Sequence, residues 1–154
     1  MTEDGLFVCQ APAMNIWDDE WGEQDEDWSG GGALTKRLVP RGPLLGASLY
    51  ELGRGNFMIF HFHHGSEELL IVLRGRPTLR TGAGERQLEE GEVVHFPAGP
   101  DGAHEIRNDS GEPERYVVAG TRVSPEIVEY PNLKKVTVQS RHGIFFIHDV
   151  EEEE

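Results

Sequence analysis

Turn-forming residues divide the middle of this 154-residue chain into segments that are too short to be ordinary helices. Between residues 34 and 120, clusters rich in Gly, Pro, Asn and Asp separate runs of about four to eight residues, the usual length of strands. No stretch in this region keeps a long 3.6-residue period. The pattern is typical of an all-β sandwich or barrel with little helix. The predicted strands are 44–52, 56–63, 67–73, 77–81, 86–88, 92–96, 104–107 and 115–119.

The two ends of the chain differ in composition from this middle. The N-terminal end is rich in acids, contains all three tryptophans and leaves through a Gly-rich stretch, which predicts an irregular arm. The arm is either solvated or docks its tryptophans on the barrel or on a partner subunit. The predicted divisions are an arm at 1–33, a barrel domain at 34–148 with its barrel proper at about 44–120 and a C-terminal extension at 121–148, and an acidic tail at 149–154.

Charge and composition argue against several classes of function. The formal net charge is −14, but the excess acids lie in residues 1–30 and 149–154, and the middle has as many acids as bases. A basic face for nucleic acid is therefore not expected. No apolar run is long enough for a membrane span, and the N-terminus lacks a signal-peptide pattern. The single cysteine, Cys9, rules out an internal disulfide, so we expect a cytoplasmic protein with neither nucleic-acid nor membrane partners.

Two histidines and a glutamate lie close together in the run 55–75. Side chains two residues apart on a strand share a face, so His61 and His63 point in the same direction. On a continuous strand Glu68 would face away from them, but 64–66 reads His-Gly-Ser, a natural turn that brings the next strand back opposite the pair. A carboxylate at the start of an apolar strand face is costly to bury unless it is paired or coordinates a metal.

A fourth candidate ligand, His104, begins a later strand that can lie beside the first pair in a closed barrel. Three imidazoles and one carboxylate leave two open positions on an octahedral ion, which a catalytic metal needs for water, dioxygen or a chelating substrate. Such ligands suit Fe(II), Mn(II), Ni(II), Zn(II), Co(II) or Cu(II) and do not choose among them. We therefore expect one divalent transition metal at His61, His63, Glu68 and His104.

Two sequence motifs resemble those of the cupin superfamily. The first reads Gly55, five residues, His61-x-His63, four residues, Glu68, six residues and Gly75. The second reads Gly91, five residues, Pro97-x-Gly99, then His104, three residues and Asn108. It departs from the family pattern in one respect, because four residues separate Gly99 from His104 where the family has two. The chain is similar to small single-domain bacterial cupins of undefined function.

The resemblance implies a jelly-roll barrel, that is, a double-stranded β-helix, which is often dimeric. It also implies that the metal is held by His61, His63, Glu68 and His104. Family members include dioxygenases, isomerases and epimerases as well as storage and sugar-sensing domains, so the fold does not settle the function. Two expectations stay open: a metal-dependent enzyme of dioxygenase or isomerase type that acts on a small molecule, and a non-catalytic module that binds a metal or a small ligand.

Few other side chains near the motifs offer catalytic or binding chemistry. The candidates to touch a metal ligand or the substrate are His95, Tyr50 and Arg74. An isomerase needs a group that moves a proton, and Tyr50, His95 and Tyr116 are the residues available for it.

The segment 144–147 reads Ile-Phe-Phe-Ile and is apolar on both faces of a strand. It must therefore be covered, by the barrel or by another subunit. We expect a homodimer. The same segment and the Trp-bearing arm also leave open a third type of function, a scaffold that binds a protein partner.

Overall fold

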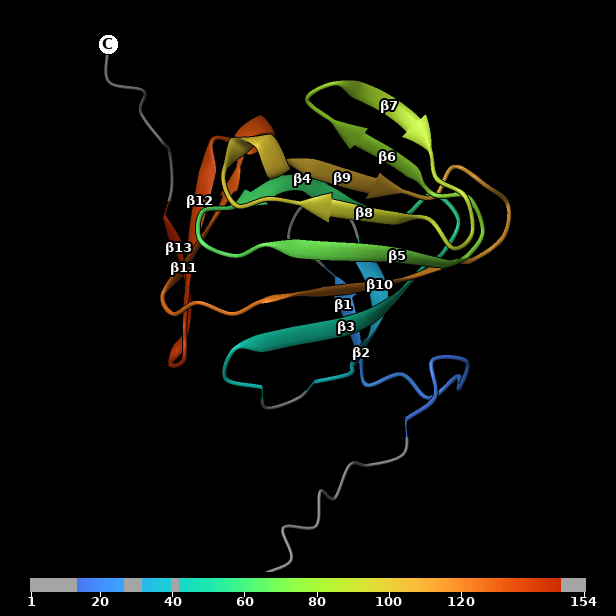
Figure 1. The fold of residues 1–154 in the computed structure, drawn as a ribbon, viewed down its shortest axis with the longest axis horizontal. Coiled ribbons are helices and arrows are strands. Elements are labelled where there is room, and N and C mark those ends of the chain that lie inside the picture. Colours follow the sequence, from blue (N-terminus) through green and yellow to red (C-terminus); the bar gives the residue numbers. More distant parts are fainter. Residues whose placement is uncertain (1–13, 27–31, 40–41, 148–154) are drawn as a thin grey trace, which may run out of the picture.

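The computed structural model describes residues 14–26, 32–39 and 42–147. Nearly all of its regular structure is strand, arranged in two sheets that face each other (Figure 1). One sheet has six strands in the order β1-β2-β3-β10-β5-β8, and the other has seven in the order β13-β12-β11-β4-β9-β6-β7.

The strands are β1 (Glu23–Glu26), β2 (Gly32–Arg37), β3 (Leu45–Leu52), β4 (Phe57–His63), β5 (Glu68–Arg74), β6 (Thr78–Thr81), β7 (Gly84–Gln87), β8 (Val93–Phe96), β9 (His104–Arg107), β10 (Glu114–Thr121), β11 (Glu126–Tyr130), β12 (Lys135–Ser140) and β13 (Gly143–Ile147). Two short 3₁₀ helices, η1 (Pro100–Gly102) and η2 (Pro131–Leu133), are the only helical turns in the described ranges. No helix in those ranges is long and apolar enough to cross a bilayer.

The order of the strands confirms the predicted jelly roll. From β3 to β10 the chain passes back and forth between the two sheets, and only β6 and β7 stay in one sheet as a hairpin. This winding is what defines a double-stranded β-helix, and it closes a core between the inner faces.

The core lies between the two sheets because alternate side chains of each strand point inward. Leu52 and Val72 come from the six-stranded sheet, Leu79 and Ile106 come from the seven-stranded sheet, and all four are at most 3% exposed. Burial of such a side chain stabilises the fold by roughly 1.5–3 kcal/mol. Leu69, on the opposite face of β5, is 38% exposed, as the alternation requires.

The C-terminal extension is part of the seven-stranded sheet. Its strand β11 pairs with β4, with Val128 opposite His63, and β12 and β13 add a further antiparallel hairpin. The extension therefore borders the strand that carries two of the candidate ligands. Its last strand is a sheet edge whose Ile144, Phe145 and Ile147 are 52–59% exposed, so the barrel does not cover them.

The described part of the arm docks on the barrel. Strand β1 pairs with β2, and Arg115 of β10, itself only 1% exposed, binds the carbonyl of Ile16 at 2.8 Å. The guanidinium of Arg115 also lies over the rings of Trp17 and Trp21, 5.9 and 4.9 Å from their centroids. Cation–π contact with the tryptophans and hydrogen bonding together hold the arm in place. Cys9, Trp28 and the acidic tail lie outside the described residues.

Candidate metal centre

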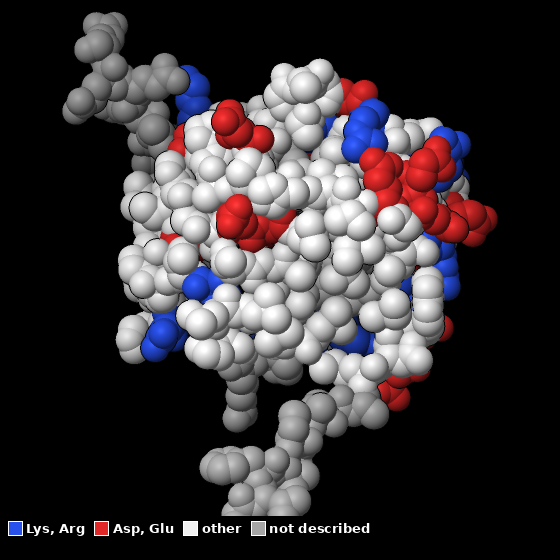
Figure 2. Space-filling view, viewed as in Figure 1, with Lys and Arg blue, Asp and Glu red and all other residues white. Residues whose placement is uncertain are grey.

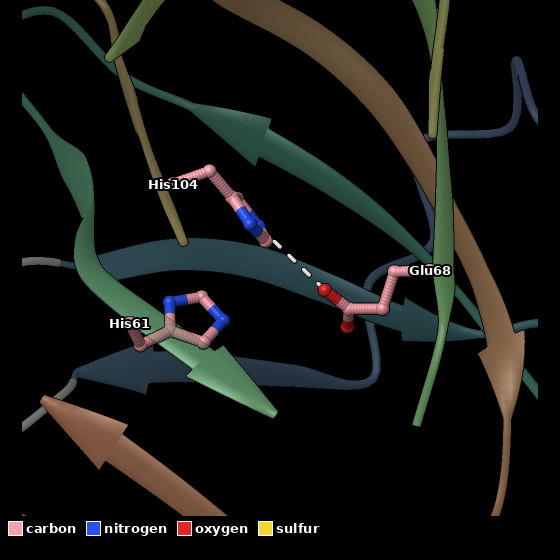
Figure 3. A group of neighbouring side chains, drawn as sticks. All are labelled: His61, Glu68 and His104. Carbon is pink, nitrogen blue, oxygen red and sulfur yellow. Dashed lines mark ion pairs between the residues drawn. The ribbon is translucent and has the colours of Figure 1, made fainter. Parts of the chain in front are cut away.

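Three of the predicted ligands, His61, Glu68 and His104, lie together in one group (Figure 3). His61 of β4 and His104 of β9 are direct neighbours across an antiparallel pair, and their ring centroids are 4.7 Å apart. Glu68 begins β5 in the other sheet and reaches across to them. One ligand atom from each of these residues lies within 4.8 Å of the other two.

His63 contacts the same carboxylate from a second direction. Its Nε2 lies 3.3 Å from Oε1 of Glu68, while Nε2 of His104 lies 3.6 Å from Oε2. The Nδ1 atom of His63 is buried and has no hydrogen-bond partner among the described residues. The three predicted histidine ligands therefore lie around the carboxylate of Glu68.

Backbone carbonyls fix the orientation of two imidazoles. Nδ1 of His61 lies 2.6 Å from the carbonyl oxygen of Ile59, and Nδ1 of His104 lies 2.8 Å from that of Gly102. A carbonyl only accepts hydrogen bonds, so each Nδ1 carries the proton and each Nε2 is left with a lone pair. A histidine that binds a metal through one ring nitrogen usually donates such a hydrogen bond from the other.

The loop before β9 supplies one of these carbonyls. It turns through η1, and a Cβ on Gly102 would lie 1.9 Å from the carbonyl oxygen of Pro97, so only glycine fits there. The N–H of Gly99 donates to the carbonyl of His63 at 2.7 Å, which ties the loop to β4. The ring of Phe96 stacks on His104 with centroids 3.6 Å apart. The loop and this ring together hold His104 in position.

The electrostatics keep Glu68 ionised and His104 neutral. Burial alone would raise the pKa of Glu68, but its hydrogen bond and charge interaction with His63 are the main effects that oppose it and lower the pKa to about 2. Burial, followed by the neighbouring His61, lowers the pKa of His104 to about 3. Burial also lowers the pKa of His63, but its hydrogen bond and ion pair with Glu68 raise it by more.

A cavity of about 620 Å³ lies beside this group, and His63, Glu68 and Tyr50 form part of its wall. The volume falls in the range of small-molecule sites, roughly 300–1,000 Å³. The remaining wall comes from the start of β3, the end of β10 and the C-terminal extension.

Comparison with known proteins agrees with the fold and the motifs. Residues 48–120 match the family model of the cupin domain. The chain is a member of the cupin superfamily. A search of curated proteins gave no match to this cupin.

Three solved structures show what the cupin resembles. A putative sugar phosphate isomerase from Acidithiobacillus ferrooxidans is 26% identical, with a TM-score of 0.75 and 86% of this chain and 89% of that chain covered. A sugar phosphate isomerase of the cupin superfamily from Silicibacter pomeroyi is 26% identical, with a TM-score of 0.69 and coverage of 79% and 80%. A Cupin 2 conserved barrel domain protein from Salinispora arenicola, 22% identical with a TM-score of 0.56 and coverage of 72% and 91%, shares the fold.

The other predicted site residues of the cupin lie in different places. Tyr50 lines the cavity and stacks on the buried Tyr116, with ring centroids 5.3 Å apart. His95 lies outside it, exposed and 3.0 Å from Glu67. Arg74 lies at the opposite end of β5 from Glu68, with its guanidinium 5.3 Å from the centroid of the Trp17 ring.

The C-terminal extension contributes to the cavity wall, which the sequence did not predict. Glu126 of β11 lies there and accepts hydrogen bonds from the N–H of Gly65 and the hydroxyl of Ser66. Strand β11 pairs with β4 although the two segments are about 60 residues apart in the sequence. No local sequence pattern predicts this pairing. The His-Gly-Ser turn at 64–66 was the one local sequence feature that pointed to this part of the cavity wall.

The donor set of the cupin fits a divalent transition metal. It offers two imidazoles with fixed tautomers, and His63 and an ionised carboxylate that line the neighbouring cavity. These are the residues that could hold a metal and leave positions open toward a small molecule.

Proposed function

We propose that this cupin is a metal-dependent isomerase that acts on a phosphorylated sugar. The observation that carries the proposal is the cavity whose wall includes His63 and Glu68, because a small molecule bound there meets the candidate metal centre directly. The isomerase type is supported by two similar structures, one of a putative and one of a named sugar phosphate isomerase.

In this proposal one divalent metal is held by His61, His63, Glu68 and His104. When bound, such an ion polarises the carbonyl and hydroxyl oxygens of a sugar. The protein's own contribution is orientation: the carbonyls of Ile59 and Gly102 fix the histidine rings, and Glu68 supplies the negative charge.

Interconversion of an aldose and a ketose moves a hydrogen between neighbouring carbons, so it needs a group that takes and returns a proton. Two side chains on the cavity wall besides the proposed ligands offer this chemistry, Tyr50 and Glu126. Of the three bases expected from the sequence, Tyr116 is buried beneath Tyr50 and His95 points away from the cavity. We assign proton transfer to Tyr50 and Glu126.

The test begins with metal analysis of untagged protein, followed by NMR detection of aldose–ketose conversion with a panel of sugar phosphates. We expect about one ion per chain, loss of conversion on chelation and recovery when metal is returned. His61→Gln and Glu68→Gln should lose both metal and conversion, whereas Tyr50→Phe should keep the metal and lose turnover.

The matched control is His95→Gln, which removes an exposed imidazole outside the cavity and should change neither metal content nor conversion. Unchanged metal content in His61→Gln would contradict the assigned ligands. Oxygen uptake by iron-loaded protein without isomerisation would favour the dioxygenase type, and binding of a sugar phosphate without conversion would favour the non-catalytic module.

We also infer that the cupin forms a homodimer in which a second copy covers β13. The support is the exposed apolar surface of Ile144, Phe145 and Ile147 on a strand that ends its sheet.

A further inference from the structure

We propose that Arg122 and Arg141, which both line the cavity, bind the phosphate group of the substrate. The inference rests on the proposed function, because it assigns one part of the same substrate to particular residues. Both arginines lie in the C-terminal extension, outside the two motifs that carry the candidate ligands.

The two arginines and the candidate metal centre share one cavity. Arg122 follows the end of β10, two residues after Gly120, and Arg141 lies in the turn between β12 and β13. Both line the cavity that His63 and Glu68 also line. A molecule that fills this space therefore meets both the histidine–glutamate group and two guanidinium groups on the cavity wall.

The side chain of Arg122 is held in a defined position. Its Nε lies 3.0 Å from the point where Gly46 would carry a Cβ, so the side chain crosses the backbone of β3 where there is no side chain to obstruct it. Its Nη1 donates to the carbonyl oxygen of Gly42 at 3.2 Å. One contact orients the planar group, and its other N–H donors are available to a ligand.

The charge of both arginines is uncompensated within the described ranges. Neither makes an ion pair there, whereas five other arginines pair with carboxylates at 2.5–3.7 Å: Arg76, Arg80, Arg86, Arg107 and Arg115. Of the two carboxylates on the cavity wall, Glu68 contacts His63, and Glu126 accepts hydrogen bonds from the N–H groups of Gly65 and Ile127 and the hydroxyl of Ser66.

The distribution of charge over the molecule supports the same conclusion. A protein with a net charge of −14 repels anions unless it presents a local positive region. Figure 2 shows acidic and basic atoms side by side on the right of this face, and basic atoms also on the left, the side on which β11–β13 lie. Arg141 belongs to the turn between β12 and β13 on that side, and it lines the cavity.

A phosphate monoester is the anion that matches this pair. It carries about 1.5–2 negative charges at neutral pH and presents three acceptor oxygens. A guanidinium binds two of these oxygens at once, and two guanidinium groups from separate segments hold a phosphate from two sides. The hydroxyls of Ser124 and Ser140 line the same part of the cavity and add donors.

The experiment measures binding of D-ribose 5-phosphate, D-ribose and inorganic phosphate to the metal-loaded protein by calorimetry. The variants are Arg122→Gln, Arg141→Gln and the double variant. Arg54→Gln is the control, because it removes one exposed positive charge outside the cavity. Metal content and thermal unfolding are measured for each protein.

We expect the dissociation constant of the phosphate ester to rise about tenfold in each single variant and about a hundredfold in the double variant. Arg54→Gln should stay within about twofold of the wild type, and D-ribose should bind equally weakly to all proteins. If Arg122→Gln disturbs the turn at Gly42, Arg141→Gln still tests the proposal, since its side chain makes no hydrogen bond with the described residues. Affinity for the phosphate ester that is unchanged in the double variant overturns the inference.

The outcomes separate this inference from the proposed function. Conversion of sugar phosphates with the same KM in the double variant would refute the phosphate site and leave the isomerase. Arginine-dependent binding of inorganic phosphate and ribose 5-phosphate without conversion by any metal-loaded form would support the phosphate site and refute the isomerase.

Discussion

Single glycines decide how closely the strands approach the candidate metal centre. Gly120 of β10 lies opposite Glu68, and a Cβ there would sit 2.6 Å from the carbonyl oxygen of Glu67 and 3.3 Å from Cγ of Glu68. A contact of 2.6 Å with a backbone oxygen cannot be relieved by rotating a side chain. The position of the carboxylate therefore depends on the absence of a side chain at residue 120.

Gly120→Ala should push β5 outward and displace Glu68. We expect metal affinity to fall by about tenfold or more, the size of effect seen when the contacts that orient a ligand are lost. The measurement is competition with a chelating dye. Gly82→Ala is the control, because a Cβ there meets no atom within 4 Å, and equal affinity of the two variants would contradict the assigned role of Glu68.

Glu114 is a buried carboxyl that the candidate site does not use. It is 1% exposed, its Oε1 accepts from the N–H of Arg76 at 3.3 Å, and its Oε2 has no partner among the described residues. Burial raises the pKa of Glu114 above its ordinary value of 4.5. A carboxyl with a raised folded pKa favours the folded state at low pH, and this contribution is lost as the pH rises through the folded pKa.

Glu114→Gln should therefore stabilise the protein at neutral pH by about 1 kcal/mol, because a neutral amide costs less to bury than a carboxylate. The gain should disappear below about pH 4.5, where the carboxyl is protonated in both states. Urea unfolding at a series of pH values measures it. The control Glu112→Gln changes an exposed carboxyl and should show no such pH dependence.

At the scale of elements, the loop before β9 accounts for the one departure from the cupin motif. The two extra residues are taken up by the single turn of η1, which returns the chain to β9 and leaves the carbonyl of Gly102 beside His104. The longer loop therefore keeps His104 beside Glu68, and the insertion changes the shape of the rim.

One buried side chain, that of Arg115, makes several of the contacts that hold the arm on the barrel. Arg115 binds Oε2 of Glu51 at 2.7 Å and Oδ1 of Asp19 at 3.0 Å, and it lies over both described tryptophans. Removing one member of a buried ion pair costs roughly 3–5 kcal/mol, because the remaining charge is left without a partner.

Arg115→Gln should lower the free energy of unfolding by about 3 kcal/mol and release the arm. We expect tryptophan emission to shift to longer wavelength, and chymotrypsin to cleave at Trp17 or Trp21 in the otherwise folded protein. Arg86→Gln removes a surface pair with Glu92 and should leave the free energy of unfolding nearly unchanged. An arm that stays protected in Arg115→Gln would show that other contacts hold it.

Much of the barrel could be predicted from the sequence because its signals are local. Turn residues set the strand ends, and the run predicted at 104–107 is the observed β9. His61, Glu68 and His104 meet as predicted because strand alternation and the His-Gly-Ser turn fix their directions.

The rest of the site depended on long-range geometry. Alternation put Arg74 on the same face of β5 as Glu68, but six residues of strand separate the two by about 20 Å, which takes Arg74 out of the cavity. His95 lies opposite the exposed Leu69 and so faces outward. The pairing of β11 with β4, which completes the cavity wall, has no signature in either segment.

At the scale of the whole molecule, the two sheets end differently. Strand β8 ends the six-stranded sheet with the exposed Val93, whereas β13 ends the seven-stranded sheet with three exposed large apolar residues. Unpaired strand edges with apolar side chains favour association with another chain. The sheet edge at β13 is therefore where the proposed dimer should form.

Phe145→Ser should shift the protein from dimer to monomer in sedimentation velocity, because it removes the most exposed of these side chains. Val93→Ser makes a matched change on β8, at the edge of the six-stranded sheet, and should leave the dimer intact. A wild-type protein that sediments as a monomer would refute the inferred homodimer, and a monomer produced only by Val93→Ser would move the interface to β8.

The docked arm affects the route by which a small molecule can enter and leave the barrel. The end of the barrel away from the candidate metal centre is filled by Leu52, Val72 and Tyr116 and is overlaid by Trp17. A molecule that reaches Glu68 through the cavity must therefore leave by the path along which it entered. Substrate entry and product release share one path and cannot occur at the same time. A product that stays bound at the entrance therefore slows the binding of the next substrate and leaves the chemical step unchanged.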